Sequence, residues 1–142
     1  PVARWVGAVA LVAIAYDLTA RALGRPLVPT VMLEAWRTAD WPALFWVAMV
    51  VAAPLVEEVL FRGFFFAGLV RSRFGPTLAI VLPAVVWTLL HLQYDAFDLS
   101  FVLVLGLVLG LARWRSGSLA TCFVAHGFVN LVAMLEMVAI GG

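Results

Sequence analysis

The sequence predicts an all-α protein, a polytopic transmembrane helix bundle with about five membrane segments. Of its 142 residues, 65% are hydrophobic and 12% are charged, whereas a soluble domain carries about 45–50% apolar and about 25% charged residues. The apolar residues gather in long segments, and an open sheet would leave their backbone groups unpaired in lipid, so we expect helices. The net charge of +1 gives no reason to expect a nucleic-acid partner.

The chain divides into five apolar segments within one domain, residues 1–142. They are residues 2–23, 41–70, 77–92, 99–114 and 118–140. Turn-forming stretches separate them, namely GRP, FGP, YDAFD and RSGS. Each segment is about long enough to cross a hydrocarbon core of roughly 30 Å. No internal repeat or second domain interrupts this order.

Individual segments carry further signals. The first continues through Asp17 into TARALG without a cleavage site, so we interpret it as an uncleaved helix rather than a signal peptide. The second is too long for one untilted crossing, and Pro54 is expected to kink it. In the fourth, Gly106 and Gly110 form a small-xxx-small pattern that permits close helix contact.

The basic residues predict an orientation and a location. Arg71 and Arg73 follow the second segment, and Arg113 and Arg115 follow the fourth. Two crossings separate the pairs, so they share one side, which the positive-inside rule makes cytoplasmic. All basic residues are arginine, a bias that indicates a GC-rich bacterial genome. We therefore expect an integral multi-pass protein of the bacterial inner membrane.

Three charges in EEVLFRG, residues 57–63, interrupt the second segment. Each charge at mid-bilayer costs about 2.5–3.5 kcal/mol on insertion scales, so a partner is expected. Glu58 and Arg62 are four residues apart and meet on one helix face, which favours a structural ion pair. Glu57 is rotated by about 100° from Glu58 and is left without this explanation.

Both histidines of the chain lie in or at the end of apolar segments. Trp87 and His91 are one turn apart in WTLLH, and His126 and Asn130 are one turn apart in HGFVN. A rise of about 1.5 Å per residue places Glu57, both histidines and Asn130 roughly 12–22 Å from the proposed cytoplasmic ends. The four groups are therefore compatible with one layer of the bundle.

Glutamate, two histidines and asparagine in such a layer favour hydrolysis of an acyl bond. Glu57 with His91 would deprotonate a water molecule, while His126 and Asn130 would stabilise an oxyanion. A peptide bond is the natural substrate within a membrane. Alternatively, Glu57, His91 and His126 would bind zinc and leave a fourth position open. Cys122, four residues before His126, is a weaker nucleophile candidate and fits better as a small apolar filler.

The three motifs, in this order, resemble those of the CAAX protease and bacteriocin-processing (CPBP, or Abi) family of intramembrane proteases. The family pattern is EExxxR, then an aromatic residue four positions before a histidine, then HxxxN or HxxxB. EEVLFRG, WTLLH and HGFVN match it within residues 41–135. The one variation is Trp87, where phenylalanine is commoner.

The resemblance implies a glutamate-dependent membrane endopeptidase of the kind that removes the last three residues from prenylated CAAX proteins. By this likeness Glu57 and His91 activate water, and His126 and Asn130 form the oxyanion site. The residues with supporting roles are Glu58, Arg62 and Trp87. No cofactor is expected, although zinc is the alternative stated above.

The resemblance also bears on partners and completeness. Bacterial members are linked to bacteriocin maturation, self-immunity or processing of sorting signals, so the expected partners are the lipid bilayer and a membrane-associated protein or peptide. Five helices are fewer than full-length members typically have, which predicts a truncated family core. A non-catalytic membrane scaffold or immunity protein is the main alternative to a protease, and a proton relay is the other.

Overall fold

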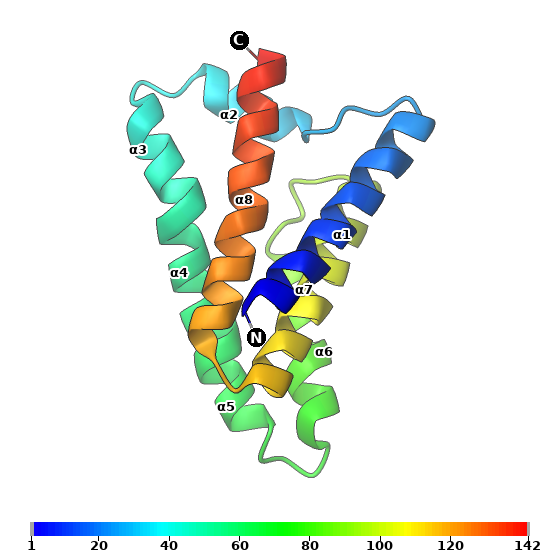
Figure 1. Cartoon of the computed structure of the whole chain (residues 1–142), viewed down its shortest axis with the longest axis vertical. Helices are drawn as coiled ribbons and strands as arrows, with labels where there is room; N and C mark the ends of the chain where they lie inside the picture. Colours follow the sequence, from blue (N-terminus) through cyan, green and yellow to red (C-terminus); the bar gives the residue numbers. More distant parts are fainter. Residues whose placement is uncertain (1, 142) are drawn as a thin grey trace.

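The computed structural model describes residues 2–141, and within that range every regular element is a helix. Figure 1 shows the long helices running roughly along one direction, with α8 packed between α1 and the helix that contains α4. The elements are α1 (Val2–Ala22), α2 (Thr30–Arg37), α3 (Pro42–Val47), η1 (Ala48–Ala52), α4 (Ala53–Glu58), η2 (Val59–Phe65), α5 (Phe66–Leu69), α6 (Gly75–Leu89), α7 (Ala96–Ser116) and α8 (Leu119–Gly141). The predicted fold class is confirmed.

Four helices are long and apolar enough to span a membrane. They are Val2–Ala22, the continuous helix Pro42–Leu69, Ala96–Ser116 and Leu119–Ile140. The fifth predicted segment forms α6, which has 15 residues and is therefore about 22 Å long, less than the roughly 30 Å of a hydrocarbon core. Within residues 2–141 the chain thus has the four candidate spans and the one shorter apolar helix of a multi-pass membrane protein.

The bounds of two predicted segments differ from those of the helices by more than one residue. The segment 77–92 becomes α6, which ends at Leu89, so that His91 lies in the following turn and donates its backbone N–H to the Thr88 carbonyl at 2.9 Å. The segment 99–114 becomes α7, which begins three residues earlier. The Asp95 carboxylate accepts hydrogen bonds from the backbone N–H groups of Phe97 and Asp98 and so caps the start of this helix.

A short helix, α2, lies between α1 and α3, where the apolar pattern predicted no helix. Figure 1 shows it crossing the end of the bundle near the C-terminus. Met32 and Trp36 pack against Met134 and Met137 of α8, while Glu34 is exposed. Eight residues with two charges are too few and too polar to appear in a search for spans. An amphipathic helix of this kind suits a membrane interface.

The continuous helix Pro42–Leu69 widens at two places into π-helical turns, η1 and η2. The first ends directly before α4, in which Pro54 is the second residue. Proline has no backbone N–H and breaks the regular ladder of a helix, so the irregularity lies where Pro54 predicted one. The two π turns flank Glu57 and Glu58, and such turns are frequent at functional sites.

Helices α6 and α7 approach each other closely at two glycines of α7. A Cβ atom on Gly106 would lie 3.1 Å from the Cβ of Ala84, and one on Gly110 would lie 3.1 Å from the Cγ2 of Ile80. The small-xxx-small pattern therefore does mark a helix contact, as predicted. The main core lies beside it and contains Val9, Phe61, Trp87, Val102, Leu105, Leu109, Ala125 and Val129.

The predicted common side of the arginine pairs also agrees with the fold. The connection between α5 and α6 carries Arg71 and Arg73, and the turn after α7 follows Arg113 and Arg115. Figure 1 shows both connections at the same end of the bundle, opposite to the C-terminus.

The glycine contact can be tested by enlarging one residue. We expect Gly110→Val to lower the free energy of unfolding in detergent by about 1–3 kcal/mol, because the new side chain would meet Ile80 and force the helices apart. Gly7→Val is the matched control, since nothing lies within 4 Å of a Cβ at that position in α1. Equal effects of the two substitutions on thermal unfolding would contradict this contact.

Candidate active site

One cavity gathers all four predicted catalytic side chains. It measures about 150 Å³ and is lined by residues of several helices. Glu57 comes from α4, His126 and Asn130 come from α8, and His91 comes from the turn after α6. Trp87 lines the same cavity. The predicted layer of polar residues is therefore present, and the next question is how its members are paired.

Glu58 and Arg62 form the predicted ion pair, deep in the protein. Arg62 Nη1 donates to Glu58 Oε1 at 2.8 Å, and both side chains are 1% exposed. The second guanidinium nitrogen, Nη2, donates to the backbone carbonyl of Gly106 at 2.9 Å. The pair thus connects η2 and α4 with α7. The sequence predicted the pair from its spacing but gave no sign of the Gly106 contact, which depends on helix packing.

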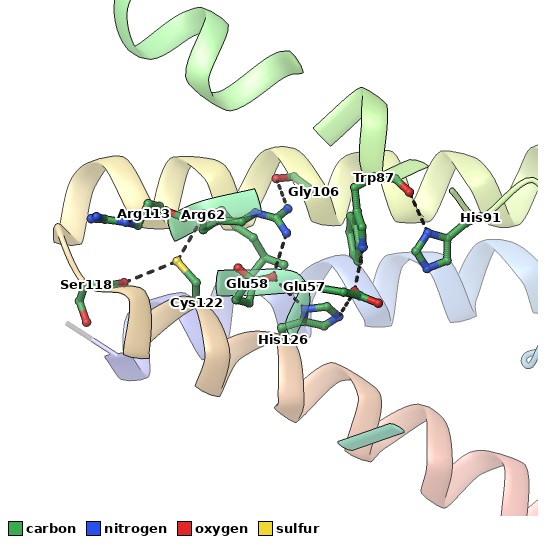
Figure 2. A network of polar contacts seen from close by, with 11 residues as sticks. Glu57, Glu58, Arg62, Trp87, His91, Gly106, Arg113, Ser118, Cys122 and His126 are labelled. Atoms are coloured by element: carbon green, nitrogen blue, oxygen red, sulfur yellow. Dashed lines mark hydrogen bonds and ion pairs between the residues drawn. The ribbon is translucent and has the colours of Figure 1, made fainter. Parts of the chain in front are cut away.

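His126 is the second partner of Glu58. The distance from His126 Nδ1 to Glu58 Oε1 is 2.9 Å. Beside a carboxylate paired with arginine this nitrogen donates its proton. The other ring nitrogen, Nε2, lies 3.8 Å from Glu57 Oε2. Figure 2 shows the imidazole between the two glutamates. His126 therefore bridges the buried ion pair and the carboxylate of Glu57.

Glu57 has a different environment from its neighbour. Its side chain is 27% exposed, against 1% for that of Glu58. Its Oε2 accepts a hydrogen bond from the Trp87 indole Nε1–H at 2.8 Å. Glu57 has no arginine partner among residues 2–141. Of the two adjacent glutamates, Glu57 is the one whose carboxylate opens on the cavity.

His91 is connected to Glu57 through Trp87 rather than by a direct hydrogen bond. The His91 Nδ1 lies 2.8 Å from the backbone carbonyl of Trp87. A carbonyl only accepts hydrogen bonds, so Nδ1 carries the proton, and Nε2 of the neutral ring is free to accept one. The imidazole also lies edge-on to the Trp87 indole, with 5.2 Å between ring centroids. This tautomer suits a group that accepts a hydrogen bond from water.

Asn130 makes a contact that the sequence did not predict. Its Nδ2 donates to the backbone carbonyl of Met49 at 2.8 Å. In the π turn the N–H of Ala53 donates to the carbonyl of Ala48, so the next amide in that register would belong to residue 54. Pro54 has none, and Asn130 supplies the donor that the carbonyl of Met49 would otherwise lack. One of the two N–H groups of the Asn130 amide is thus engaged at the helix break.

Glycine allows α8 to approach that break. A Cβ atom on Gly127 would lie 3.0 Å from the backbone oxygen of Val50. Any larger side chain would push α8 away from η1. Close approach at Gly127 therefore helps to bring Asn130 within hydrogen-bond distance of Met49.

The zinc and cysteine alternatives find less support in the geometry. Within residues 2–141 no three His, Cys, Asp or Glu side chains are grouped so as to hold a metal ion, so the predicted set of Glu57, His91 and His126 is not assembled as ligands. Cys122 is fully buried, and its Sγ donates to the carbonyl of Leu109 at 3.5 Å. This agrees with the interpretation of Cys122 as a small apolar filler.

Tyr94 is a site residue that the sequence analysis missed. It lines the cavity next to His91, with 5.6 Å between the ring centroids. Burial, together with the negative charges of Asp98 and Glu57, raises the pKa of Tyr94 to about 12, so the phenol keeps its proton at neutral pH. Its position three residues after His91, in the YDAFD break, was the available signal.

Comparison with known families gives a match over the part of the chain that carries the three motifs. The model of the Rce1-like family, described as type II CAAX prenyl endopeptidase Rce1-like, matches residues 39–132. This range includes EEVLFRG, WTLLH and HGFVN. No solved structure matches the chain.

Two curated relatives are themselves described as uncharacterized. The chain is 32% identical over 134 residues to an uncharacterized 24.3 kDa protein of Escherichia coli, and the match covers 92% of this chain and 61% of that protein. It is 28% identical over 98 residues to an uncharacterized protein of Mycoplasma capricolum, with 68% of this chain and 28% of that protein covered. The chain thus spans less than two thirds of the length of either relative.

The buried ion pair predicts a large loss of stability when its cation is removed. Arg62→Met leaves Glu58 as an uncompensated buried charge, and we expect the free energy of unfolding in detergent to fall by about 3–5 kcal/mol. Arg71→Met, at an exposed position, is the control and should change it by about 0.5 kcal/mol or less. Similar values for the two variants would show that the Arg62 charge is not buried as described.

The contact between Asn130 and Met49 can be tested with a double-mutant cycle. We expect Asn130→Leu to cost about 1–3 kcal/mol of unfolding free energy, since it leaves the Met49 carbonyl without a donor. In a Pro54→Ala background a backbone N–H is available again, so Asn130→Leu should cost about 1 kcal/mol less. Strictly additive effects would contradict the proposed relation between the proline and the asparagine.

Proposed function

Because the chain belongs to the Rce1-like family of type II CAAX prenyl endopeptidases, we propose that it is an intramembrane endopeptidase that hydrolyses peptide bonds of membrane-associated substrates. The observation that carries this proposal is the unequal treatment of the two adjacent glutamates. Glu58 forms a buried ion pair with Arg62, whereas Glu57 lines the cavity together with His91 and His126. A carboxylate available beside two imidazoles is suited to general acid–base chemistry.

The first step of the proposed reaction is activation of water. Glu57 takes a proton from the water molecule, and His91 orients it through the unprotonated Nε2. The oxygen then attacks the carbonyl carbon of the peptide bond and gives a tetrahedral intermediate. When the bond to nitrogen breaks, Glu57 returns the proton to the leaving amine, as microscopic reversibility allows for a general base that becomes a general acid.

The second part of the proposal concerns the negative charge on the intermediate. His126 is the nearest candidate donor, with Nε2 at the cavity side and Nδ1 bonded to Glu58. Because Nδ1 already donates to Glu58, a second donation from Nε2 requires both nitrogens to be protonated, which makes the ring an imidazolium. The carboxylates of Glu57 and Glu58 lie on either side of this ring and favour its positive charge. Asn130 contributes as a second donor through the N–H of its amide that is not bonded to the carbonyl of Met49.

The cavity also supports a substrate with apolar side chains. Methionines from three elements line it, together with Leu105 and Val129 of the core. An extended segment of a membrane-associated protein, such as a CAAX-type or bacteriocin-type sequence at the surface of a bacterial inner membrane, fits such a lining. Burial of its apolar side chains would supply binding free energy at about 25 cal/mol per Å².

The proposal is tested by cleavage of membrane-associated peptides in detergent, followed by mass spectrometry. We expect the wild type to cleave and Glu57→Gln to lower the rate by about 100-fold or more, the usual contribution of a general acid–base group. Glu34→Gln, at an exposed position in α2, is the matched control and should cleave like the wild type.

Two other results would lead to different functions. Wild-type cleavage that stops with a chelator and returns with added zinc would assign the chemistry to a metal centre. A folded wild type that cleaves no peptide, with a biological effect that survives Glu57→Gln, would leave a non-catalytic membrane scaffold.

A further inference from the structure

Trp87 makes a specific polar contact that packing alone does not require. Its indole Nε1–H donates to Glu57 Oε2 at 2.8 Å, although the two residues are 30 positions apart and belong to different helices. The side chain of Trp87 is 3% exposed. Figure 2 shows the indole nitrogen directed at the carboxylate.

The ring that carries this donor is fixed by its surroundings. The imidazoles of His91 and His126 both lie edge-on to it, each with 5.2 Å between centroids. The guanidinium carbon of Arg62 lies 4.9 Å from the ring centroid. On the α7 side a Cβ atom on Gly106 would lie 3.2 Å from the indole Cε3, so a larger residue there would press against the ring. The indole N–H therefore has one well-defined direction.

The chemistry of the contact suits positioning rather than proton transfer. An indole N–H is a donor only and does not exchange protons with a carboxylate at ordinary pH. A hydrogen bond to Oε2 fixes the orientation of the Glu57 carboxylate and leaves its other oxygen for a further partner. Fixing a reacting group in this way lowers the entropy that must be lost in the transition state.

We propose that Trp87 is the positioning residue of the site: its indole N–H holds the Glu57 carboxylate in the orientation in which it meets water. The indole ring also lies against Arg62, and the backbone carbonyl of Trp87 bonds to His91. One residue thus sets the direction of both groups assigned to water activation. The kinetic part of this inference rests on the proposed function, whereas the hydrogen bond itself can be tested without it.

The hydrogen bond is tested by NMR of the full chain in detergent micelles with ¹⁵N-labelled indole groups. The chain has six tryptophans, and the Trp87 signal is the one that Trp87→Phe removes. We expect Glu57→Ala to move the Trp87 indole proton upfield, since its acceptor is lost, and the other indole signals to stay in place. Glu34→Ala should leave all of them unchanged. A Trp87 signal that does not respond to Glu57→Ala would overturn the inference.

The positioning role is tested by steady-state kinetics on a cleaved peptide. We expect Trp87→Phe, which keeps an aromatic ring but lacks the N–H, to lower kcat by roughly 10- to 100-fold, the equivalent of one hydrogen bond to a charged group. KM should change by no more than about twofold, because the lost contact is not made to the substrate. Trp5→Phe is the control, since Trp5 is a buried tryptophan in a separate cluster with Ala112 and Cys122.

The outcomes separate the two proposals. A Trp87→Phe enzyme with the wild-type kcat would show that only ring packing matters and would overturn the positioning role while the proposed function stands. A wild type that cleaves no peptide would overturn the proposed function, and the NMR comparison alone then decides whether Trp87 holds Glu57.

Discussion

The buried guanidinium of Arg62 is the group on which the other polar contacts of this bundle depend. A cation in the apolar interior is costly unless it is paired and fully hydrogen-bonded. Arg62 is paired with Glu58, donates a second hydrogen bond to the carbonyl of Gly106 and lies against the face of Trp87. Its own backbone carbonyl accepts a hydrogen bond from Arg113 Nε at 3.0 Å. Since these partners lie on α4, α6 and α7 and Arg62 itself lies on η2, a single residue fixes how the four elements meet.

This arrangement explains why two glutamates stand side by side in apolar sequence. Glu58 neutralises Arg62 and orients His126, and both of its roles use the same oxygen. Glu57 points the other way, toward the cavity, where Trp87 rather than a cation is its partner. Adjacent positions on a helix differ by about 100° in direction, so one motif supplies a structural carboxylate and a reactive one. The structural half is shown by the geometry, and the reactive half is the proposal.

Contacts governed by spacing along one helix could be predicted from the sequence. The pair Glu58–Arg62 and the glycine contact of α7 are of this kind, because i, i+4 neighbours share a face whatever the rest of the fold does. The common layer of Glu57 and His126 followed from helix rise alone. The prediction of helical spans was equally secure, since lipid admits few other structures.

Contacts between helices, and departures from regular helix geometry, could not be predicted in this way. The hydrogen bond from Trp87 to Glu57 depends on how α6 packs against α4. The hydrogen bond from the Asn130 amide to Met49 depends on the π turn that precedes Pro54. The predicted end of the segment 77–92 was wrong by three residues, because the apolar sequence continues past Leu89, the last residue of α6. Each of these differences changes the hydrogen-bond partners of a group in the cavity, so the pairing within the site required the structure.

The different roles of the two glutamates, one in a buried ion pair and one open to the cavity, are tested most directly by the free energies of unfolding of Glu57→Gln and Glu58→Gln, measured in the same detergent. The substitutions are chemically identical and occupy neighbouring positions. We expect Glu58→Gln to lower the free energy of unfolding by about 3–5 kcal/mol, because Arg62 would be left as a buried unpaired charge. Glu57→Gln should lower it by about 1 kcal/mol or less, because its partner is a neutral donor that an amide oxygen also satisfies. Equal losses, or a larger loss for Glu57→Gln, would contradict the account.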